Sequence, residues 1–167
     1  IEELVKLTRD GTCKQKEIGA CALAQLAVHK DNKGIVAKTG GIPPLVKLVS
    51  DGTRVQKEKA MAALAMLADE HKDNTALIAQ ELGILPLIRL AQKGTNTQRN
   101  MAACALYSLA KNEDTGNMIT QEGYISSLVE LSRNGTTPTQ KYFAAATIKE
   151  LSARKMSIMM PCDLKYL

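Results

Sequence analysis

Large aromatic side chains are scarce in this sequence. Its 167 residues include four tyrosines, one phenylalanine and no tryptophan. A core with so few rings must be built from Leu, Ile, Val, Ala and Met, which favours packed helices. No stretch approaches 18 consecutive apolar residues, so a membrane-spanning helix is excluded.

Charge of one sign and paired cysteines are also lacking. The 22 Lys and Arg against 17 Asp and Glu give a net charge of +5, with no dense basic block. Four cysteines without a CxxC pair predict neither a disulfide framework nor a zinc site. The opening residues, Ile1 to Leu4, lack the basic and apolar regions of a secretory signal. We therefore expect an intracellular protein, cytoplasmic or nuclear.

The chain does have an internal repeat. A repeat of this length indicates the fold class more strongly than any local feature of the sequence. Four similar segments begin 41, 42 and 41 residues apart, and each is followed four residues later by a glycine. A second matching stretch ends in a leucine at spacings of 41, 42 and 42 residues. The segments are Ile1–Leu7, Ile42–Leu48, Ile84–Leu90 and Ile125–Leu131; the glycines are Gly11, Gly52, Gly94 and Gly135; the leucines are Leu26, Leu67, Leu109 and Leu151.

Each repeat is predicted to contain a short, a medium and a long helix. The glycine after each medium helix is expected to end it in the left-handed conformation. A capping box, in which a Thr and a Gln three residues later each bond the other's backbone N–H, then opens the long helix. The fourth copy has Pro138 at its first helical position and Thr136 as an inserted residue. The four boxes are Thr12/Gln15, Thr53/Gln56, Thr95/Gln98 and Thr137/Gln140.

The chain resembles the armadillo repeat family over roughly residues 1–153. The pattern that carries the resemblance is Asn74…Leu77-Ile78…Gly83-Ile84-x-Pro86-Leu87-x-x-Leu90…Gly94-Thr95…Ala105-Leu106-x-x-Leu109-Ala110. It implies an all-α, right-handed α-solenoid of about four repeats, the first lacking its first helix. We place the repeats at residues 1–41, 42–83, 84–124 and 125–153. An apolar tail, 154–167, is expected to cover the last repeat or to contact a partner.

The resemblance also implies that the long helices line a concave face that binds extended partner segments. Peptide grooves of this family use a Trp and, four residues later, an Asn on each long helix. Neither ladder is present, which disfavours recognition of nuclear-import signals. We predict instead a shallow, mildly acidic groove for a helix or for a bulky apolar or basic peptide. Its residues are the Trp positions Cys21, Ala62, Cys104 and Ala146, the Asn positions Gln25, Met66, Ser108 and Glu150, and, one turn earlier, Glu17, Glu58, Asn100 and Tyr142.

Three other kinds of site were weighed. A basic residue recurs once per repeat and could engage phosphates or nucleic acid, although readers of nucleic acid usually interleave such charges with aromatic platforms. His29 and His71 fall near the ends of long helices, where we expect them to favour the helix C-terminus. Cys21 and Cys104 lie two repeats apart, too far for a disulfide. The basic residues are Lys16, Lys57, Arg99 and Lys141.

No catalytic motif accompanies these residues: HExxH, GxSxG and glycine-rich phosphate loops are missing. The sequence therefore predicts a non-catalytic scaffold or adaptor without cofactor or metal, whose partner is another protein or peptide segment. The alternatives are a nucleic-acid or phosphate-binding module, and a structural fragment that self-associates through its open repeat end or tail.

Overall fold

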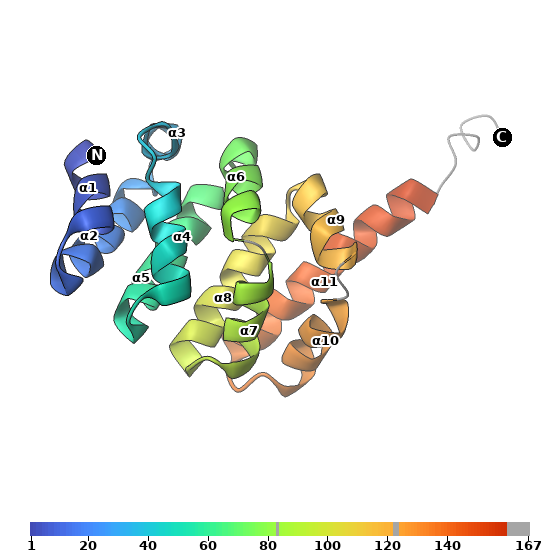
Figure 1. Cartoon of the computed structure of the whole chain (residues 1–167). Helices are drawn as coiled ribbons and strands as arrows, with labels where there is room; N and C mark the ends of the chain where they lie inside the picture. The colour runs from blue at the N-terminus through green and yellow to red at the C-terminus, as the bar shows by residue number, and fades with distance from the viewer. Residues whose placement is uncertain (83, 122–123, 160–167) are drawn as a thin grey trace, which may run out of the picture.

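The computed structural model describes residues 1–82, 84–121 and 124–159. Within these ranges the chain forms eleven α-helices and no strand, stacked as an elongated array (Figure 1). The helices are α1 (Glu2–Asp10), α2 (Cys13–Leu26), α3 (Lys30–Lys38), α4 (Ile42–Asp51), α5 (Arg54–Ala68), α6 (Lys72–Leu82), α7 (Leu85–Lys93), α8 (Asn96–Ala110), α9 (Glu113–Gln121), α10 (Ile125–Asn134) and α11 (Pro138–Met159).

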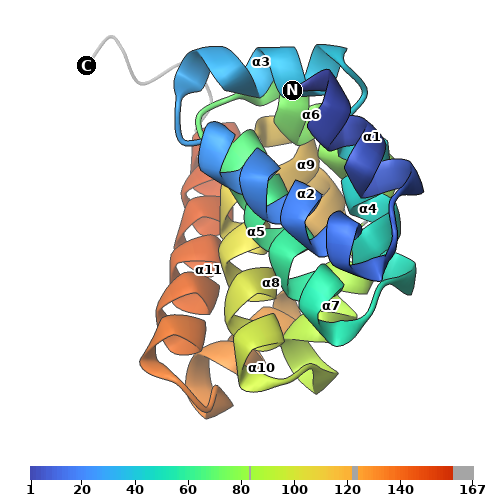
Figure 2. The same ribbon diagram turned by 90° about the vertical axis from the view of Figure 1, so that its left-hand side faces the viewer.

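The helices of the repeats form three layers, and among the described residues the fourth repeat contributes a medium and a long helix only. The long helices α2, α5, α8 and α11 lie side by side, the medium helices α1, α4, α7 and α10 back them, and the short helices α3, α6 and α9 run along one edge (Figures 1 and 2). Buried alanines such as Ala63 and Ala105 let neighbouring long helices approach closely, and leucines such as Leu64 and Leu106 fill the space between layers. The chain thus opens with a medium helix, as predicted.

The capping boxes form as predicted in the first three repeats. The fourth differs because of its inserted residue. Thr137 Oγ1 accepts from the Gln140 N–H over 3.2 Å, but Gln140 Oε1 accepts from the N–H of Thr136 over 2.9 Å. The box is therefore widened by one residue.

The predicted left-handed glycines are wrong. Gly11, Gly52 and Gly94 have φ between −68° and −71° with extended ψ, which any residue adopts. Glycine is needed for a different reason: a Cβ at Gly94 would lie 2.5 Å from the Leu90 carbonyl oxygen and 2.8 Å from Gln98 Cβ. The constraint is close approach of the chain to the preceding turn and to the capping Gln, not the sign of φ.

One left-handed residue, Glu70 with φ 54°, explains why the second repeat is a residue longer. From Leu26 the chain reaches His29 through Ala27 and Val28, but from the equivalent Leu67 it reaches His71 through Ala68, Asp69 and Glu70, which is one residue more. The added residue turns the backbone back into register for α6. A non-glycine residue there costs of order 1–3 kcal/mol unless its surroundings hold it.

Both histidines lie just beyond the end of a long helix, and their favourable effect on that helix end stays a prediction. His29 is the N-cap residue of α3, and His71 lies immediately before α6. His71 Nδ1 accepts a hydrogen bond from the Asn74 N–H over 3.3 Å, which requires that nitrogen to be unprotonated. His71 therefore helps to begin a short helix, while its own N–H donates to the Ala68 carbonyl at the end of the long one.

Helix α11 continues to Met159, past the boundary placed at residue 153. Residues 160–167, with Cys162, lie outside the described residues, so the role of the tail stays a prediction. Among the described residues, none of the helices combines the length and the hydrophobicity that a membrane-spanning segment requires.

Candidate functional site

The twelve residues predicted to bind a partner all lie on the long helices, and we call the face assigned to them the inner face. Their exposure is uneven. Gln25 is exposed, Met66 is 38% exposed and Tyr142 is 66% exposed, whereas Ser108, at 6%, is buried and offers little to a ligand. The half-buried members are Glu17, Cys21, Glu58, Ala62, Asn100, Cys104, Ala146 and Glu150.

The first row of this face consists of Glu17, Glu58, Asn100 and Tyr142. Two of these side chains already contact the next repeat. Thr95 Oγ1 donates to Glu58 Oε1 over 3.5 Å, and Thr137 Oγ1 donates to Asn100 Oδ1 over 2.7 Å. Both donors are capping threonines of the next long helix. Glu58 is also paired with Arg54, and Glu17 with Lys14. Glu58 therefore braces a repeat junction, and both carboxylates present less free negative charge than the sequence suggests.

The second row, at the Trp positions of the family, has small and uncharged side chains. Cys21, Ala62 and Cys104 are half-buried side chains on adjacent helices. Burial raises the pKa of the Cys104 thiol, and the negative charge of Asp69 adds to the effect. Cys104 is therefore neutral and packs as a small apolar group.

Sequence reasoning missed a charged pair beside this row. Lys111 Nζ lies 3.1 Å from Asp69 Oδ1 and 4.9 Å from the centroid of the Tyr107 ring. Burial disfavours the charged form of Lys111, but the hydrogen bond and charge of Asp69 outweigh it, so the pKa of Lys111 is raised. The signal was available: Asp69 and Lys111 follow the long-helix alanines 42 residues apart.

Three of the few aromatic side chains gather where α8 meets α11. The rings of Tyr107 and Phe143 have centroids 5.7 Å apart, and Tyr142 meets Phe143 edge-on at 5.3 Å. These are favourable aromatic geometries. Tyr142 is thus held in place by a neighbour while most of its surface faces solvent.

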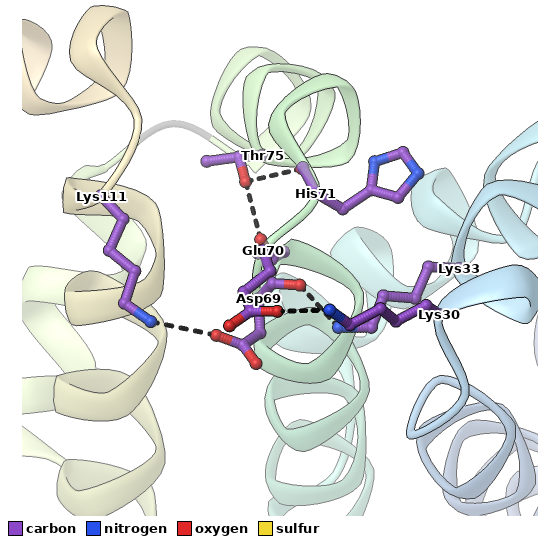
Figure 3. A network of polar contacts seen from close by, with 8 residues as sticks. Lys30, Lys33, Asp69, Glu70, His71, Thr75 and Lys111 are labelled. Carbon is purple, nitrogen blue, oxygen red and sulfur yellow. Dashed lines mark hydrogen bonds and ion pairs between the residues drawn. The ribbon is translucent and has the colours of Figure 1, made fainter.

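At one edge of the inner face, lysines from the helices on both sides contact Asp69 and Glu70 (Figure 3). Lys33 Nζ donates to the Asp69 carbonyl over 2.5 Å, and Lys30 Nζ lies 2.9 Å from Glu70 Oε2. The hydrogen bond and charge of Lys30 lower the pKa of Glu70 and, reciprocally, raise that of Lys30. The inserted loop thereby ties α5 to α3 and to α8.

Two of the four recurrent basic residues, Lys16 and Arg99, line cavities between medium helices. A cavity of about 360 Å³ contains Arg99, and an equivalent one of about 240 Å³ contains Lys16. Arg99 Nε donates to the Gly94 carbonyl over 2.9 Å, so this side chain has a role in ending α7. Acidic residues line both cavities beside the cations, namely Glu130 in the first and Asp10 and Asp51 in the second.

No group of three or more metal-ligating side chains comes together in the part of the chain that the structure describes. In the same part, Cys13, Cys21 and Cys104 are free thiols.

No family model matches this sequence. Among curated proteins, none matches it either. Solved structures do match. A designed armadillo repeat protein superimposes with a TM-score of 0.83 at 21% identity, over 90% of this chain and 63% of its own. Another, in complex with the peptide (KR)4, gives 0.79 at 18% identity over 99% of this chain and 75% of its own.

A third similar structure is that of computationally designed armadillo repeat proteins for modular peptide recognition. It has a TM-score of 0.80 at 22% identity over 89% of this chain, which spans 63% of its length. At such identities the likeness concerns the fold. The chain is an α-solenoid with the armadillo-like repeat fold.

Proposed function

We propose that this chain is a non-catalytic scaffold that holds a segment of another protein on the inner face of its long helices. The observation that carries the proposal is Tyr142, a side chain 66% exposed whose ring meets that of the neighbouring Phe143 edge-on. Exposed but ordered tyrosines are typical binding hot spots because little side-chain entropy is lost on contact. Structures with this fold include designed proteins for peptide recognition, which supports the same use of the face.

The residues of the face favour an apolar segment over a basic one. Glu17 and Glu58 are already paired with Lys14 and Arg54, so they attract a further cation weakly. Met66, Cys104 and Tyr142 offer soft, apolar contact area between them. A partner helix or strand with bulky apolar side chains fits this surface best.

Free thiols at Cys13, Cys21 and Cys104 fit a reducing compartment, and we infer that the chain works in the cytoplasm or nucleus.

Affinity capture from cell extract tests the proposal, with three variants compared. Tyr142→Ala and the double variant Met66→Arg, Glu150→Arg are expected to lose the partner while keeping the helical circular dichroism spectrum. Val55→Arg, a substitution at an exposed residue at the start of α5, is the matched control and is expected to keep it.

If the control loses the captured protein and the inner-face variants retain it, the proposed face is wrong. Capture of polyanions by the parent chain, with affinity falling steeply as salt rises, would instead support the phosphate-binding alternative.

A further inference from the structure

The cavity of about 360 Å³ that contains Arg99 lies between the medium helices α7 and α10, beside the start of α8. We call it the α7–α10 cavity. Figure 1 shows α7 and α10 next to each other, in the layer of medium helices. Its volume falls within the ordinary range of small-ligand pockets. None of the twelve residues assigned to the inner face lines it.

The cavity results from the way in which one repeat meets the next. The equivalent cavity of about 240 Å³ lies between α1 and α4. Both include the glycine that follows the second of the two medium helices, Gly52 in one and Gly135 in the other. Because α4 is followed by a further repeat, an opening at this place is a property of the repeat junction.

Arg99 supplies the most specific chemistry of the α7–α10 cavity. Its Nε donates to the Gly94 carbonyl over 2.9 Å, which orients the guanidinium. The side chain is half-buried, and its other N–H groups have no acceptor among the described residues. The other three recurrent basic residues are lysines. A guanidinium held in this way presents paired N–H groups that match the two oxygens of a carboxylate, whereas an ammonium group acts as a point charge.

Uncharged groups complete the lining. Gln92 Nε2 donates to Ser127 Oγ over 2.8 Å and so joins α7 to α10 at the cavity. Since this oxygen is the acceptor, the Ser127 hydroxyl keeps its own hydrogen to donate. The Asn134 amide makes no hydrogen bond in the part of the chain that the structure describes, and Ala91 and Leu131 add apolar surface. A few convergent polar groups beside apolar surface are typical of a ligand site.

The charged residues that line the cavity are Lys93, Arg99 and Glu130. None of the three takes part in an ion pair within residues 1–82, 84–121 and 124–159. Two cations and one carboxylate leave an excess of one positive charge in the lining, which a single anionic group would neutralise.

The groups around the lining are also mainly basic. Three further charged residues belong to the same helices and to the start of α11, and all are cations. They are Arg89, Arg133 and Lys141. Lys141 is close, since a Cβ at Gly135 would lie 3.3 Å from its Cγ. Glu58 of the preceding long helix reaches Thr95, but it is already paired with Arg54.

The equivalent cavity between α1 and α4 is less suited to an anion. Three cations and two carboxylates line it, and Arg9 is paired with Asp10 over 3.0 Å. Asp51 stands there in place of the uncharged Asn134, and the recurrent basic residue is Lys16. An anionic ligand would compete with both carboxylates for the cations.

We propose that the α7–α10 cavity binds one carboxylate group, carried by a small organic acid or by an Asp or Glu side chain of a peptide. Arg99 holds the two carboxylate oxygens, Lys93 adds attraction, and Ser127 donates its hydroxyl hydrogen. Ala91 and Leu131 contact the carbon atoms next to the carboxylate. The site uses no residue of the inner face and stands independently of the proposed function.

Glu130 limits how much negative charge the site accepts. Every negative charge beyond the first meets this carboxylate in the same cavity, and like charges close together repel. The site therefore favours a monocarboxylate over inorganic phosphate, which carries more negative charge at neutral pH.

NMR titration of the 167-residue chain tests the proposal with two carboxylate probes. One is butyrate, and the other is the peptide acetyl-Ala-Glu-Ala-amide, whose Glu side chain is its only carboxylate. The Arg99 Nε–H signal and the backbone N–H signals of Ala91 and Leu131 are expected to shift and to saturate. Butyramide, which has the shape of butyrate without the charge, is expected to leave them unchanged.

The two probes also distinguish the sources of the carboxylate. Saturation by the peptide alone assigns the site to a peptide side chain, and saturation by butyrate alone assigns it to a free acid. Failure of both probes would overturn the proposal. Inorganic phosphate that bound more tightly than either probe would overturn the choice of a carboxylate.

Two variants should change the affinity in opposite directions. Arg99→Lys keeps the charge but loses the paired N–H groups, and it is expected to weaken carboxylate binding at least about tenfold. Glu130→Gln removes the like charge and is expected to tighten binding about threefold. Arg133→Gln is the matched control, because it removes an exposed cation of α10 that does not line the cavity, and it should change the affinity less than about twofold. If Arg99→Lys binds as the parent does, Arg99 does not hold the ligand and the proposal is wrong.

Thermal unfolding separates lost binding from lost folding. Lysine stands at the position of Arg99 in the other three repeats, so Arg99→Lys is expected to fold. Glu130 is exposed, and its variant should keep the parent's unfolding midpoint. If Arg99→Lys does unfold, the effect of Glu130→Gln decides, since weaker binding by this variant would contradict the assigned geometry. Tyr142→Ala should leave carboxylate binding unchanged, whatever its effect on partner capture.

Discussion

The ammonium group of Lys33 in α3 donates to the backbone carbonyl of Asp69, the residue that follows α5. Lys33 is buried, and its own carbonyl accepts from Asn74 Nδ2 of α6 over 3.1 Å. A cation at the carboxyl end of a helix opposes the negative end of the helix dipole and satisfies a carbonyl that has no partner within the helix. One lysine thus connects two short helices and the end of a long one.

Replacing Lys33 with Met is expected to destabilise the fold by about 1–3 kcal/mol, because the part-buried Asp69 carbonyl loses its donor. Urea denaturation followed by circular dichroism measures the change. Lys72→Met, at an exposed lysine at the start of α6, is the control and should shift the midpoint little. Equal midpoints for the two variants would show that the Lys33 contact contributes nothing to stability.

Gln56 and Gln15 separate the two roles of the capping glutamine. Glutamate at either position keeps the oxygen that caps its own helix, but it loses the amide donor. At Gln56, which is buried, the new carboxylate would meet the Cys13 carbonyl, and we expect a loss of about 2–3 kcal/mol. At Gln15, which is exposed, we expect a change within about 0.5 kcal/mol.

A large loss at both positions would mean that the capping box, and not the contact between repeats, depends on the amide.

The repeat, its helices and three of the capping boxes could be predicted because each depends on local chemistry. Thr12, Thr53 and Thr95 are followed by Gln at the spacing that the box requires, and apolar residues recur at helical spacing. The armadillo-like fold follows from that order of helices. Twelve residues were assigned to the inner face, and their role as a binding site stays a prediction.

What could not be predicted depends on how one repeat meets the next. Nothing local in the sequence shows that Glu58 and Asn100 brace the following threonines or that Ser108 is buried. The glycines were misinterpreted for a related reason. A left-handed turn and a close approach both select glycine, and only the position of the Leu90 carbonyl distinguishes them.

The pKa of the Glu70 carboxyl is expected to lie below its ordinary value, because Lys30 donates a hydrogen bond to it and attracts its charge. A lowered pKa means that the pair's contribution to stability is present above the unfolded-state value and is lost as pH falls through the folded-state value. NMR titration of the Glu70 side chain measures it directly. Lys30→Ala should raise this pKa toward the ordinary value.

Lys38→Ala, at an exposed lysine at the end of the same helix, should leave the titration of Glu70 unchanged. If Lys30→Ala has no effect either, the ion pair does not form in solution. At high pH the sign reverses. The raised pKa of Lys30 means that its contribution persists until pH rises through that folded-state value.

Gly34 and Gly94 are expected to respond to alanine in opposite directions. Gly34 lies inside α3, and a Cβ there would meet only His71 Nε2, at an ordinary contact distance of 3.6 Å. Gly34→Ala should therefore stabilise the chain by about 0.5–1 kcal/mol through helix propensity.

At Gly94 the Cβ would press on backbone and on Gln98, so the helix ends must shift, and Gly94→Ala should cost about 1–3 kcal/mol. Thermal unfolding of both variants decides the point. If Gly94→Ala were as stable as Gly34→Ala, close approach would not be the reason for the recurring glycine, because φ at Gly94 is permitted to both residues.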